Sequence, residues 1–237
     1  MRPVVQGGSY PRPSAAASQR DVPAKEEVVN LEKQYQALEL ELAADDPWRL
    51  DGNPFERERH TQMLRLARSQ DRITNALEVG CAAGAFTEKL APHAQRLTVV
   101  DVMPRAIGRA CQRTKRWSHI TWIASDILEF TSAERFDLIV VAEILYYLKD
   151  VEQMRTAIQN LVRMLAPGGR VVFGSALDAT CRRWGHAAGA ETVISIFKET
   201  LTEIERLHCQ GASSNEDCLL VLFGKEGRAP EQSNIRP

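Results

Sequence analysis

The sequence predicts an α/β protein with a mostly parallel, seven-stranded sheet, and three observations support this fold class. Short apolar runs alternate with helical patterns from Ala76 to Ser175, an order typical of a parallel sheet with helices on both faces. The run Phe136–Ala142 is almost entirely aliphatic, as expected of a strand that is buried on both faces. A turn of small residues, Gly80–Gly84, follows the first run.

Helices are indicated by apolar residues that recur every three or four positions. Three boundaries have a local cause in proline and its neighbours: Asp45-Asp46-Pro47 stops the first helix, Pro104 begins the fourth, and Pro167-Gly168-Gly169 ends the fifth. The expected helices are Glu26–Leu42, Phe55–Ser69, Phe86–Ala91, Pro104–Arg116, Val151–Leu165 and Ala190–Thr200.

Strands are indicated by short runs rich in Val, Ile, Leu and aromatic residues. The expected strands are Ala76–Val79, Leu97–Val100, Ile120–Ala124, Phe136–Ala142, Arg170–Ser175, Leu201–Cys209 and Asp217–Phe223. The last two are separated by only a short turn around Ser213-Ser214-Asn215. Since no crossover helix fits there, they should form a hairpin with at least one antiparallel strand.

The chain is expected to divide into four parts. Residues 1–24 are rich in Pro, Gly, Ser and Ala and should form a disordered tail, because they cannot offset their ordering entropy by burial. Residues 25–72 should form a helical cap, residues 73–225 the ligand-binding domain, and residues 226–237 a shorter tail.

Composition narrows the classes of function. The 30 basic and 31 acidic side chains balance, so nothing indicates a nucleic-acid partner. The 5 cysteines include no C-x-x-C pair, which argues against a disulfide framework or a metal site. No apolar run has the length of a membrane span or signal peptide. We therefore expect a cytoplasmic protein that acts on a small molecule without a metal or an obligate protein partner.

The stretch Ala76–Asp101 resembles a nucleotide-type binding unit. Its turn lets a ligand approach the backbone, and Asp101, 21 residues after Gly80, can accept hydrogen bonds from two ribose hydroxyls. A dinucleotide site of the G-x-G-x-x-G type would place glycine where this chain has Ala82 and Ala85. Glu78 beside the turn would repel a pyrophosphate and suits a cationic ligand.

Four separated segments carry a resemblance to the class I S-adenosylmethionine-dependent methyltransferases. They are EVGCAAG (78–84), VVD (99–101), the pair Ser125-Asp126, and FDLIVVAEILYYL followed by LAPGGRVVF. The resemblance spans about residues 75–225 and implies the Rossmann-like fold of that family. The chain departs from the family at Ala82, where many members have glycine, which should tighten the turn without abolishing binding.

A narrower resemblance, to the nodulation N-methyltransferases, rests on three further segments. They are EILYYL, RRWGHAAGAETV (182–193) and DPWRLDGNPFERERH (46–60). This resemblance implies methylation of the free amine of a deacetylated glucosamine at the non-reducing end of a chitooligosaccharide, during nodulation-factor synthesis. The residues themselves indicate only a small-molecule methyltransferase.

The family resemblance assigns the donor side of the site. Gly80 and Gly84 are expected to let the amino-acid part of S-adenosylmethionine lie against the backbone, and Glu78 to order this loop or its waters. Asp101 should bind the hydroxyls of the ribose; its alternative role is to cap the N-terminus of the helix that begins near Pro104. The adenine should contact four residues: Val102, Met103, Asp126 and Ile127. Arg59 should pair with the carboxylate of the cofactor; the alternative is a surface salt bridge with Glu56 or Glu58.

The acceptor side is expected around Glu143, at the carboxyl end of Phe136–Ala142. Glu143 is the expected acid/base, because the attacking amine must be neutral and a carboxylate can take its proton; a structural hydrogen bond to the cofactor or the loop is the alternative. Tyr146 should assist it. Since Tyr146 and Tyr147 are adjacent, we expect them to face different ways, with Tyr146 in the site.

Four further side chains are expected to contact the sugar: Trp48 and His60 from the cap, and Trp184 and His186 from a loop after the fifth strand. Trp48 could equally be packing, His60 could lie on the helix surface, and Arg182 and Arg183 in the same loop could simply be solvated. Three other functions stay open: an O- or C-methyltransferase of another metabolite, a cofactor-binding regulator without chemistry, and an NAD-dependent oxidoreductase.

Overall fold

The computed structural model describes residues 36, 38–44, 46–70 and 72–225. Its contacts divide the chain into two units, Met1–Ala37 and Leu38–Pro237, and the fold belongs to the second unit. Both predicted tails, and most of the predicted helix Glu26–Leu42, lie outside the described residues.

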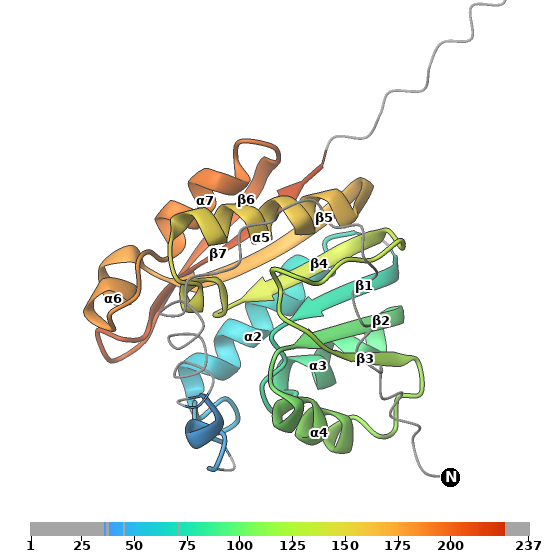
Figure 1. The fold of residues 1–237 in the computed structure, drawn as a ribbon, viewed down its shortest axis with the longest axis horizontal. Helices are drawn as coiled ribbons and strands as arrows, with labels where there is room; N and C mark the ends of the chain where they lie inside the picture. Colours follow the sequence, from blue (N-terminus) through green and yellow to red (C-terminus); the bar gives the residue numbers. More distant parts are fainter. Residues whose placement is uncertain (1–35, 37, 45, 71, 226–237) are drawn as a thin grey trace, which may run out of the picture. The chain divides into compact units, whose positions relative to one another are not determined.

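The centre of the fold is a sheet of seven strands in the order β3-β2-β1-β4-β5-β7-β6 (Figure 1). Strand β7 is antiparallel to both of its neighbours, and all other pairs are parallel. The predicted mostly parallel sheet with one antiparallel strand is confirmed. The strands are β1 (Ile73–Val79), β2 (Ala94–Asp101), β3 (Ile120–Ala124), β4 (Phe136–Ala142), β5 (Leu165–Ala176), β6 (Thr202–Gln210) and β7 (Asp217–Gly224).

The predicted bounds of β3 and β4 match the structure, but β1, β2 and β5 begin earlier than expected. Strand β5 starts at Leu165, so Pro167-Gly168-Gly169 lies inside it. Its register with β4 shifts between Leu165 and Arg170, and Gly168 has φ +74°. These breaker residues therefore occupy an irregularity at the start of the strand, where they interrupt the pairing.

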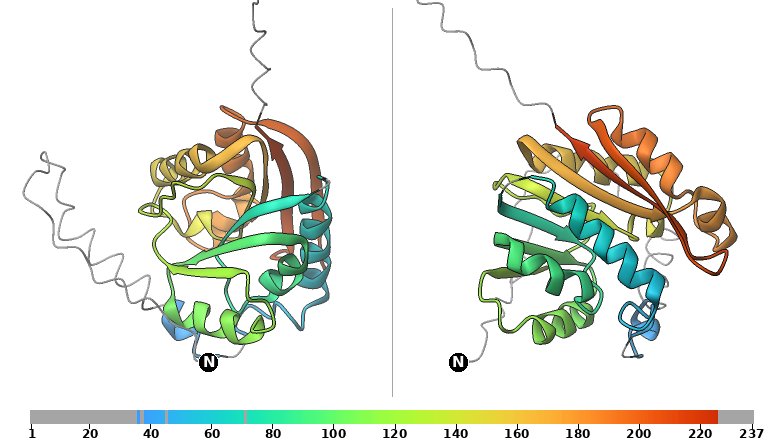
Figure 2. Two further views of the ribbon diagram at one scale, coloured as in Figure 1. Left: turned by 90° about the vertical axis from the view of Figure 1, so that its right-hand side faces the viewer. Right: turned by 180° about the vertical axis from the view of Figure 1, so that it is seen from behind.

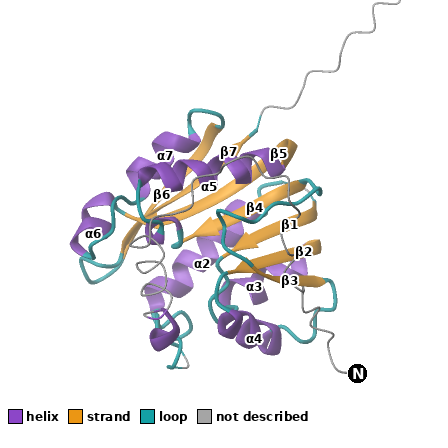
Figure 3. Ribbon diagram, in the orientation of Figure 1, coloured by secondary structure: helices purple, strands orange, loops and turns teal. Residues whose placement is uncertain are grey.

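Helices cover both faces of the sheet (Figures 1–3). Helices α5 and α7 lie on the face that Figure 1 presents, and α2 lies on the opposite face, in front in the right-hand view of Figure 2. The helices are α2 (Pro54–Ala67), α3 (Ala85–Leu90), α4 (Pro104–Arg113), α5 (Val151–Met164), α6 (Asp178–Arg183) and α7 (Ala190–Phe197), with 3-10 turns η1 (Ala91–His93) and η2 (Leu145–Tyr147).

Helix α2 differs from the cap that the sequence suggested. It contacts β5, β6, β7 and α3, and its buried face carries Arg59, His60, Met63, Leu66 and Ala67. The helix begins at Pro54, and the side chain of Asn53 caps it by accepting from the amide of Phe55. Because α2 packs on the sheet, this part of the predicted cap is a layer of the sheet domain.

The segment after β5 also differs from the prediction of a loop. Arg182 and Arg183 belong to α6, and Trp184 is its C-cap. The Asp178 carboxylate accepts hydrogen bonds from the amides of Gly189 and Thr192 and so joins the first turn of α6 to the first turn of α7. The helix is too short to show a periodic pattern in the sequence.

The largest core cluster lies between the sheet and helices α5 and α7. It includes Phe136, Phe173, Phe197 and Phe223, all fully buried, and the ring of Phe197 contacts both Phe173 and Phe223. This apolar layer fixes the strands whose ends carry the site. In the described part of the chain, no helix has the length and apolar character required to cross a membrane.

Candidate active site

The strand order reverses between β1 and β4, and open α/β sheets bind ligands at the carboxyl ends of the strands on either side of such a point. We call the carboxyl ends of the parallel strands β1, β2, β3, β4 and β5 the ligand edge. Glu143 directly follows β4 and has φ +56°, which is uncommon for a residue with a side chain and concentrates at functional sites. Its amide donates to the carbonyl of Gly174 at 2.9 Å, which ties it to β5.

Asp101 binds the turn that follows β1. Its Oδ2 accepts from the amides of Cys81 at 2.9 Å and Ala82 at 3.3 Å, and its Oδ1 accepts from the amide of Met103 at 2.8 Å. Burial raises the pKa of the Asp101 carboxyl, and the three amides oppose this rise. A carboxylate has about four acceptor positions, so roughly one remains for a ligand unless the longer Ala82 contact opens.

The glycine positions in the turn have clear packing reasons. A Cβ on Gly80, at φ +80°, would lie 2.2 Å from Cγ2 of Ile144, and a Cβ on Gly84, at φ +79°, would lie 2.8 Å from Cα of Ala110. Both positions therefore require glycine even without a cofactor. Ala82 also adopts a positive φ, +46°. This conformation costs a residue with a side chain about 1 kcal/mol, whereas glycine adopts it freely.

Glu78 is a buried acid at the base of the same turn, with 2% of its surface exposed. The pKa of its carboxyl is raised to about 8. Burial is the main cause, a hydrogen bond with Thr87 opposes the rise in part, and the negative charge of Asp101 adds to it. Its Oε2 has no hydrogen-bond partner among the described residues. The carboxyl is therefore protonated at neutral pH unless a positive charge or a new donor comes close.

The residues predicted to hold adenine lie along two strand ends. Met103 is buried and Val102 half-buried after β2. After β3, the Asp126 carboxylate accepts from the amide of Leu128 at 2.8 Å, and Ile127 packs partly against the core. The structure brings these side chains to neighbouring positions of the ligand edge, as the sequence predicted; their contact with adenine stays a prediction.

A buried cation joins α2 to the acceptor side. Arg59 is 4% exposed, its Nη1 lies 3.4 Å from Oε1 of Glu143, and its Nε and Nη2 donate to Glu56. Burial by itself lowers the pKa of Arg59, but the two carboxylates raise it overall. The alternative salt bridge with Glu56 is therefore present, but its expected place on the surface is wrong, because Arg59 lies on the packed face of α2.

Glu143 occupies the centre of this arrangement. Its Oε2 accepts from the amide of Ala176 at 3.3 Å, and 22% of its side chain remains exposed. Burial raises the pKa of its carboxyl, whereas Arg59 and a hydrogen bond from Tyr146 lower it by less. A carboxylate of this kind is a stronger base than an ordinary one and is still reachable from solvent.

Tyr146 and Tyr147 face the same side, contrary to the expectation from their adjacency. Both lie in η2, and their ring centroids are 4.8 Å apart. His186 contacts both, at 5.0 Å from Tyr146 and 5.2 Å from Tyr147. Successive residues of a 3-10 turn are separated by about 120°, not by the 180° of a strand, which allows both rings to share one cluster.

Two tryptophans complete this cluster. The ring of Trp184 lies 6.0 Å from Tyr146 in an edge-on arrangement and is 41% exposed, while Trp48 hydrogen-bonds to Tyr147. We call Trp48, Tyr146, Tyr147, Trp184 and His186 the aromatic cluster. It gathers side chains from three distant parts of the chain next to Glu143.

His60 lies apart from the aromatic cluster. It is 4% exposed, its ring packs against Phe86 of α3 at 5.6 Å, and its Nδ1 has no partner among the described residues. Burial and the charge of Arg59 lower its pKa to about 3, so it is neutral. The alternative of a place on the helix surface is wrong; contact with substrate stays a prediction.

Sequence reasoning named one contributor only as an alternative and missed another. Glu56 is the second partner of Arg59, at i, i+3 spacing on α2, but this pair was expected on the surface. Ile144 fills the space above Gly80, which no sequence pattern indicates. Among the described residues, no three His, Cys, Asp or Glu side chains form a group that could hold a metal ion.

Comparison with known proteins identifies the family. The family model of nodulation protein S, NodS, matches residues 30–230. The chain belongs to the NodS family. Nodulation protein S of Sinorhizobium fredii is 68% identical over 191 residues, which cover 81% of this chain and 88% of that protein. Nodulation protein S of Bradyrhizobium diazoefficiens is 61% identical over 203 residues, covering 86% and 97%.

A crystal structure of the N-methyltransferase NodS from Bradyrhizobium japonicum WM9, in complex with S-adenosyl-L-homocysteine, has the same fold. It is 74% identical, superposes with a TM-score of 0.80, and the match covers 81% of this chain and 98% of that one. Membership of the NodS family confirms the predicted class: the chain is an S-adenosylmethionine-dependent methyltransferase with a class I fold.

The raised pKa of Glu78 gives this NodS family member a measurable dependence of stability on pH. The folded chain holds a proton on Glu78 up to about pH 8, whereas the unfolded chain releases it near the ordinary value. Through Glu78, the free energy of unfolding should therefore fall by roughly 1.4 kcal/mol per pH unit between these values. Glu78→Gln should remove this part of the slope in urea unfolding from pH 5 to 8.5. Glu205→Gln, at a half-buried position on the sheet surface, should keep it. Equal slopes in all three proteins would contradict the assignment.

Proposed function

We propose that this NodS family member transfers a methyl group from S-adenosylmethionine to the free amine of the deacetylated glucosamine at the non-reducing end of a chitooligosaccharide, in nodulation-factor synthesis. The observation that carries the proposal is the position of Glu143, a partly exposed carboxylate with a raised pKa beside the aromatic cluster. The relative from B. japonicum WM9 is named an N-methyltransferase, which favours a nitrogen acceptor over the O- and C-methyl alternatives.

The donor side of the ligand edge fits this cofactor. When bound, S-adenosylmethionine supplies a methyl group on a positively charged sulfonium. Glu78 has a buried carboxyl oxygen without a partner among the described residues. Gly80 and Gly84 add no side chains to the turn, although a Cβ at these positions would meet Ile144 and Ala110. Asp101 retains about one acceptor position for a ribose hydroxyl.

Further donor contacts follow from the strand ends. Val102, Met103 and Ile127 would pack on the adenine, and the Asp126 carboxylate would accept from its amino group. Arg59 already has two carboxylate partners. Its proposed pairing with the cofactor's carboxylate therefore requires the longer contact, with Glu143, to open.

Glu143 acts as the base in this proposal. An amine attacks only when its lone pair is free, so its proton must leave to an acceptor within reach or through one water. Glu143 is held by the amide of Ala176 and by Arg59, which fixes its position, and its raised pKa increases its proton affinity. Because the donor methyl is already activated, positioning supplies much of the remaining rate.

The aromatic cluster would receive the sugar. Sugar rings present apolar faces that pack on aromatic side chains, and an exposed ring such as Trp184 has its face available. Tyr146 and Tyr147 form the wall nearest Glu143, and His186 backs both. His60 lies deeper, against α3, and would contact the substrate only next to the donor.

Methyl transfer to defined sugar oligomers tests this function directly. With labelled S-adenosylmethionine, the enzyme should methylate a chitooligosaccharide whose non-reducing end is deacetylated and should leave the fully acetylated oligomer unmodified. The label should stay on nitrogen after acid hydrolysis to methylated glucosamine. Transfer to neither oligomer, or transfer to a hydroxyl, would reject the proposal.

The role of Asp101 is tested by donor binding. Asp101→Ala should weaken S-adenosylhomocysteine binding in calorimetry by about tenfold or more, because a charge-assisted hydrogen bond is lost. Asp137→Ala is the matched control, since Asp137 also accepts two backbone amides, those of Thr74 and Asn75, at the opposite end of β1. Wild-type affinity in Asp101→Ala would mean that the donor site is misassigned.

The role of Glu143 is tested by turnover. Glu143→Gln keeps the shape but cannot take a proton, so turnover should fall by about 100-fold while donor affinity changes much less. In the wild type, turnover should decline as the pH drops through the raised pKa of Glu143, and the variant should lack this step. Glu205→Gln serves as the surface control. An unchanged rate and pH profile in Glu143→Gln would exclude it as the base.

A further inference from the structure

Two cysteines lie opposite each other in the hairpin next to the site. Cys209 of β6 and Cys218 of β7 are directly paired in the antiparallel register. Directly opposed residues have Cα atoms about 4.5–5.5 Å apart and point to the same face. A disulfide requires Cα atoms about 4.4–6.8 Å apart, so the register places the two cysteines within the range that a disulfide can span.

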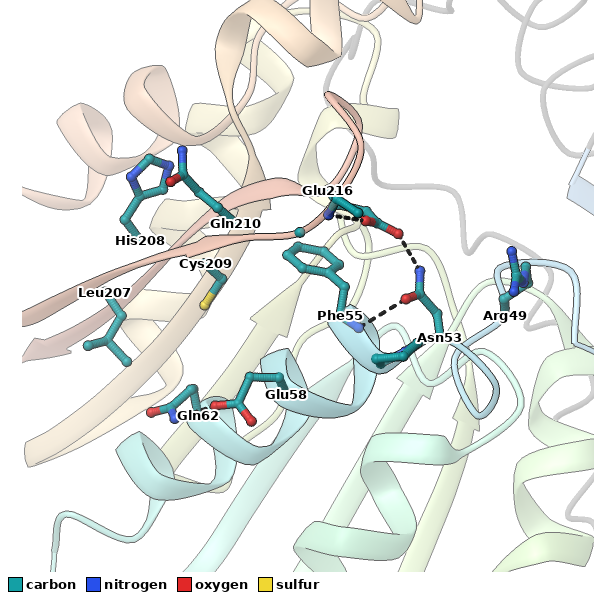
Figure 4. A pocket seen from close by; sticks show the side chains of 13 residues that line it. Arg49, Asn53, Phe55, Glu58, Gln62, Leu207, His208, Cys209, Gln210 and Glu216 are labelled. Carbon is teal, nitrogen blue, oxygen red and sulfur yellow. Dashed lines mark hydrogen bonds between the residues drawn. The ribbon is translucent and has the colours of Figure 1, made fainter.

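Cys209 is accessible from solvent. It lines an open cavity of about 770 Å³ between the first half of α2 and the β6–β7 hairpin, and its sulfur points toward α2 (Figure 4). Asn53 and Glu216 close one end of this cavity with a hydrogen bond of 2.8 Å. Cys218, by contrast, is 2% exposed. A small oxidant would therefore reach Cys209 first.

The surroundings also make Cys209 the more reactive thiol. A hydrogen bond with Cys218 lowers the pKa of Cys209 to about 7; partial burial opposes this, and the positive charge of Arg59 lowers it further. The same hydrogen bond and its own burial raise the pKa of Cys218. The thiolate is the form that reacts with peroxides.

We propose that Cys209 and Cys218 form an oxidation site at which a hydroperoxide converts the opposed thiols into a cross-strand disulfide that loosens the support of Glu143. The site rests on the register of β6 and β7 and on the opening of the cavity onto Cys209. It is separate from the residues that would hold donor and acceptor.

The chemistry proceeds in two steps. The Cys209 thiolate attacks one oxygen of the hydroperoxide, the O–O bond breaks, and Cys209 becomes a sulfenic acid as the other oxygen leaves as an alcohol, or as water from hydrogen peroxide. The Cys218 sulfur then attacks the Cys209 sulfur and releases water. In total, two thiols and one peroxide give one disulfide; both sulfurs are oxidised and the peroxide is reduced.

A short chain of backbone contacts leads from this pair to Glu143. Cys218 is paired with Ala176 in the register of β5 and β7, and the amide of Ala176 donates to Oε2 of Glu143. Opposed residues in a sheet keep their Cβ atoms slightly farther apart than a disulfide does, so the bond draws β7 toward β6. That movement pulls on the residue whose amide holds Glu143.

Peptide mapping and turnover of the full chain test this proposal with hydrogen peroxide as the probe. The wild type should lose 2 Da, with the cross-link mapped to Cys209 and Cys218, and methyl transfer should fall at least fivefold; dithiothreitol should reverse both. Cys209→Ser should show neither change, and Cys218→Ala should stop at a Cys209 sulfenic acid that dimedone traps. Cys111→Ser, which removes another half-buried thiol, should behave as the wild type.

Three results after peroxide treatment would overturn the proposal. They are the absence of a Cys209–Cys218 cross-link in the wild type, a loss of turnover in Cys209→Ser as large as that in the wild type, and full turnover in the cross-linked enzyme. The effect on turnover rests on the proposed methyl transfer, but the cross-link does not. If the reduced enzyme methylates no acceptor, the proposed function fails, while peptide mapping still decides whether the oxidation site exists.

Discussion

The acceptor side of this methyltransferase depends on one buried cation. Arg59 has lost nearly all contact with water, and among the described residues its charge is compensated by Glu56 of α2 and by Glu143, which directly follows β4. Removing one partner of such a buried pair typically costs about 3–5 kcal/mol. The pair therefore fixes the position of α2 relative to the end of β4. The same guanidinium lies close enough to influence Cys209 and Cys218, so one charge links the proposed base to the proposed oxidation site.

On the donor side, by contrast, the two acids Glu78 and Asp101 are withdrawn from water and have no cationic partner among the described residues. Burial raises the pKa of both Glu78 and Asp101. Asp101 offsets this with three backbone amides, whereas Glu78 keeps an oxygen without a partner among the described residues. Such a site favours a ligand that brings positive charge and hydrogen-bond donors, which agrees with a sulfonium cofactor and not with a pyrophosphate.

Backbone strain marks where these two sides meet. Ala82 and Glu143 adopt positive φ without being glycine, one in the turn after β1 and the other after β4. The strain is held by hydrogen bonds to neighbouring strands, through Asp101 for the turn and through Gly174 for Glu143. Pre-arranged loops of this kind lower the ordering cost of binding, and the apolar core beneath them keeps the strand ends from moving.

The sequence by itself determined the parallel sheet, its antiparallel strand and the family. The reason is that the spacing of apolar residues, the positions of proline and glycine, and the order of the motifs can all be read along the chain. It also named Asp101, Glu143 and the aromatic residues. Only the tertiary structure decided that Tyr146 and Tyr147 share one cluster, that Arg59 is buried between two carboxylates, and that Cys209 faces Cys218. These facts depend on turn geometry, on the face that α2 turns to the sheet and on strand register, which bring together residues far apart in the chain.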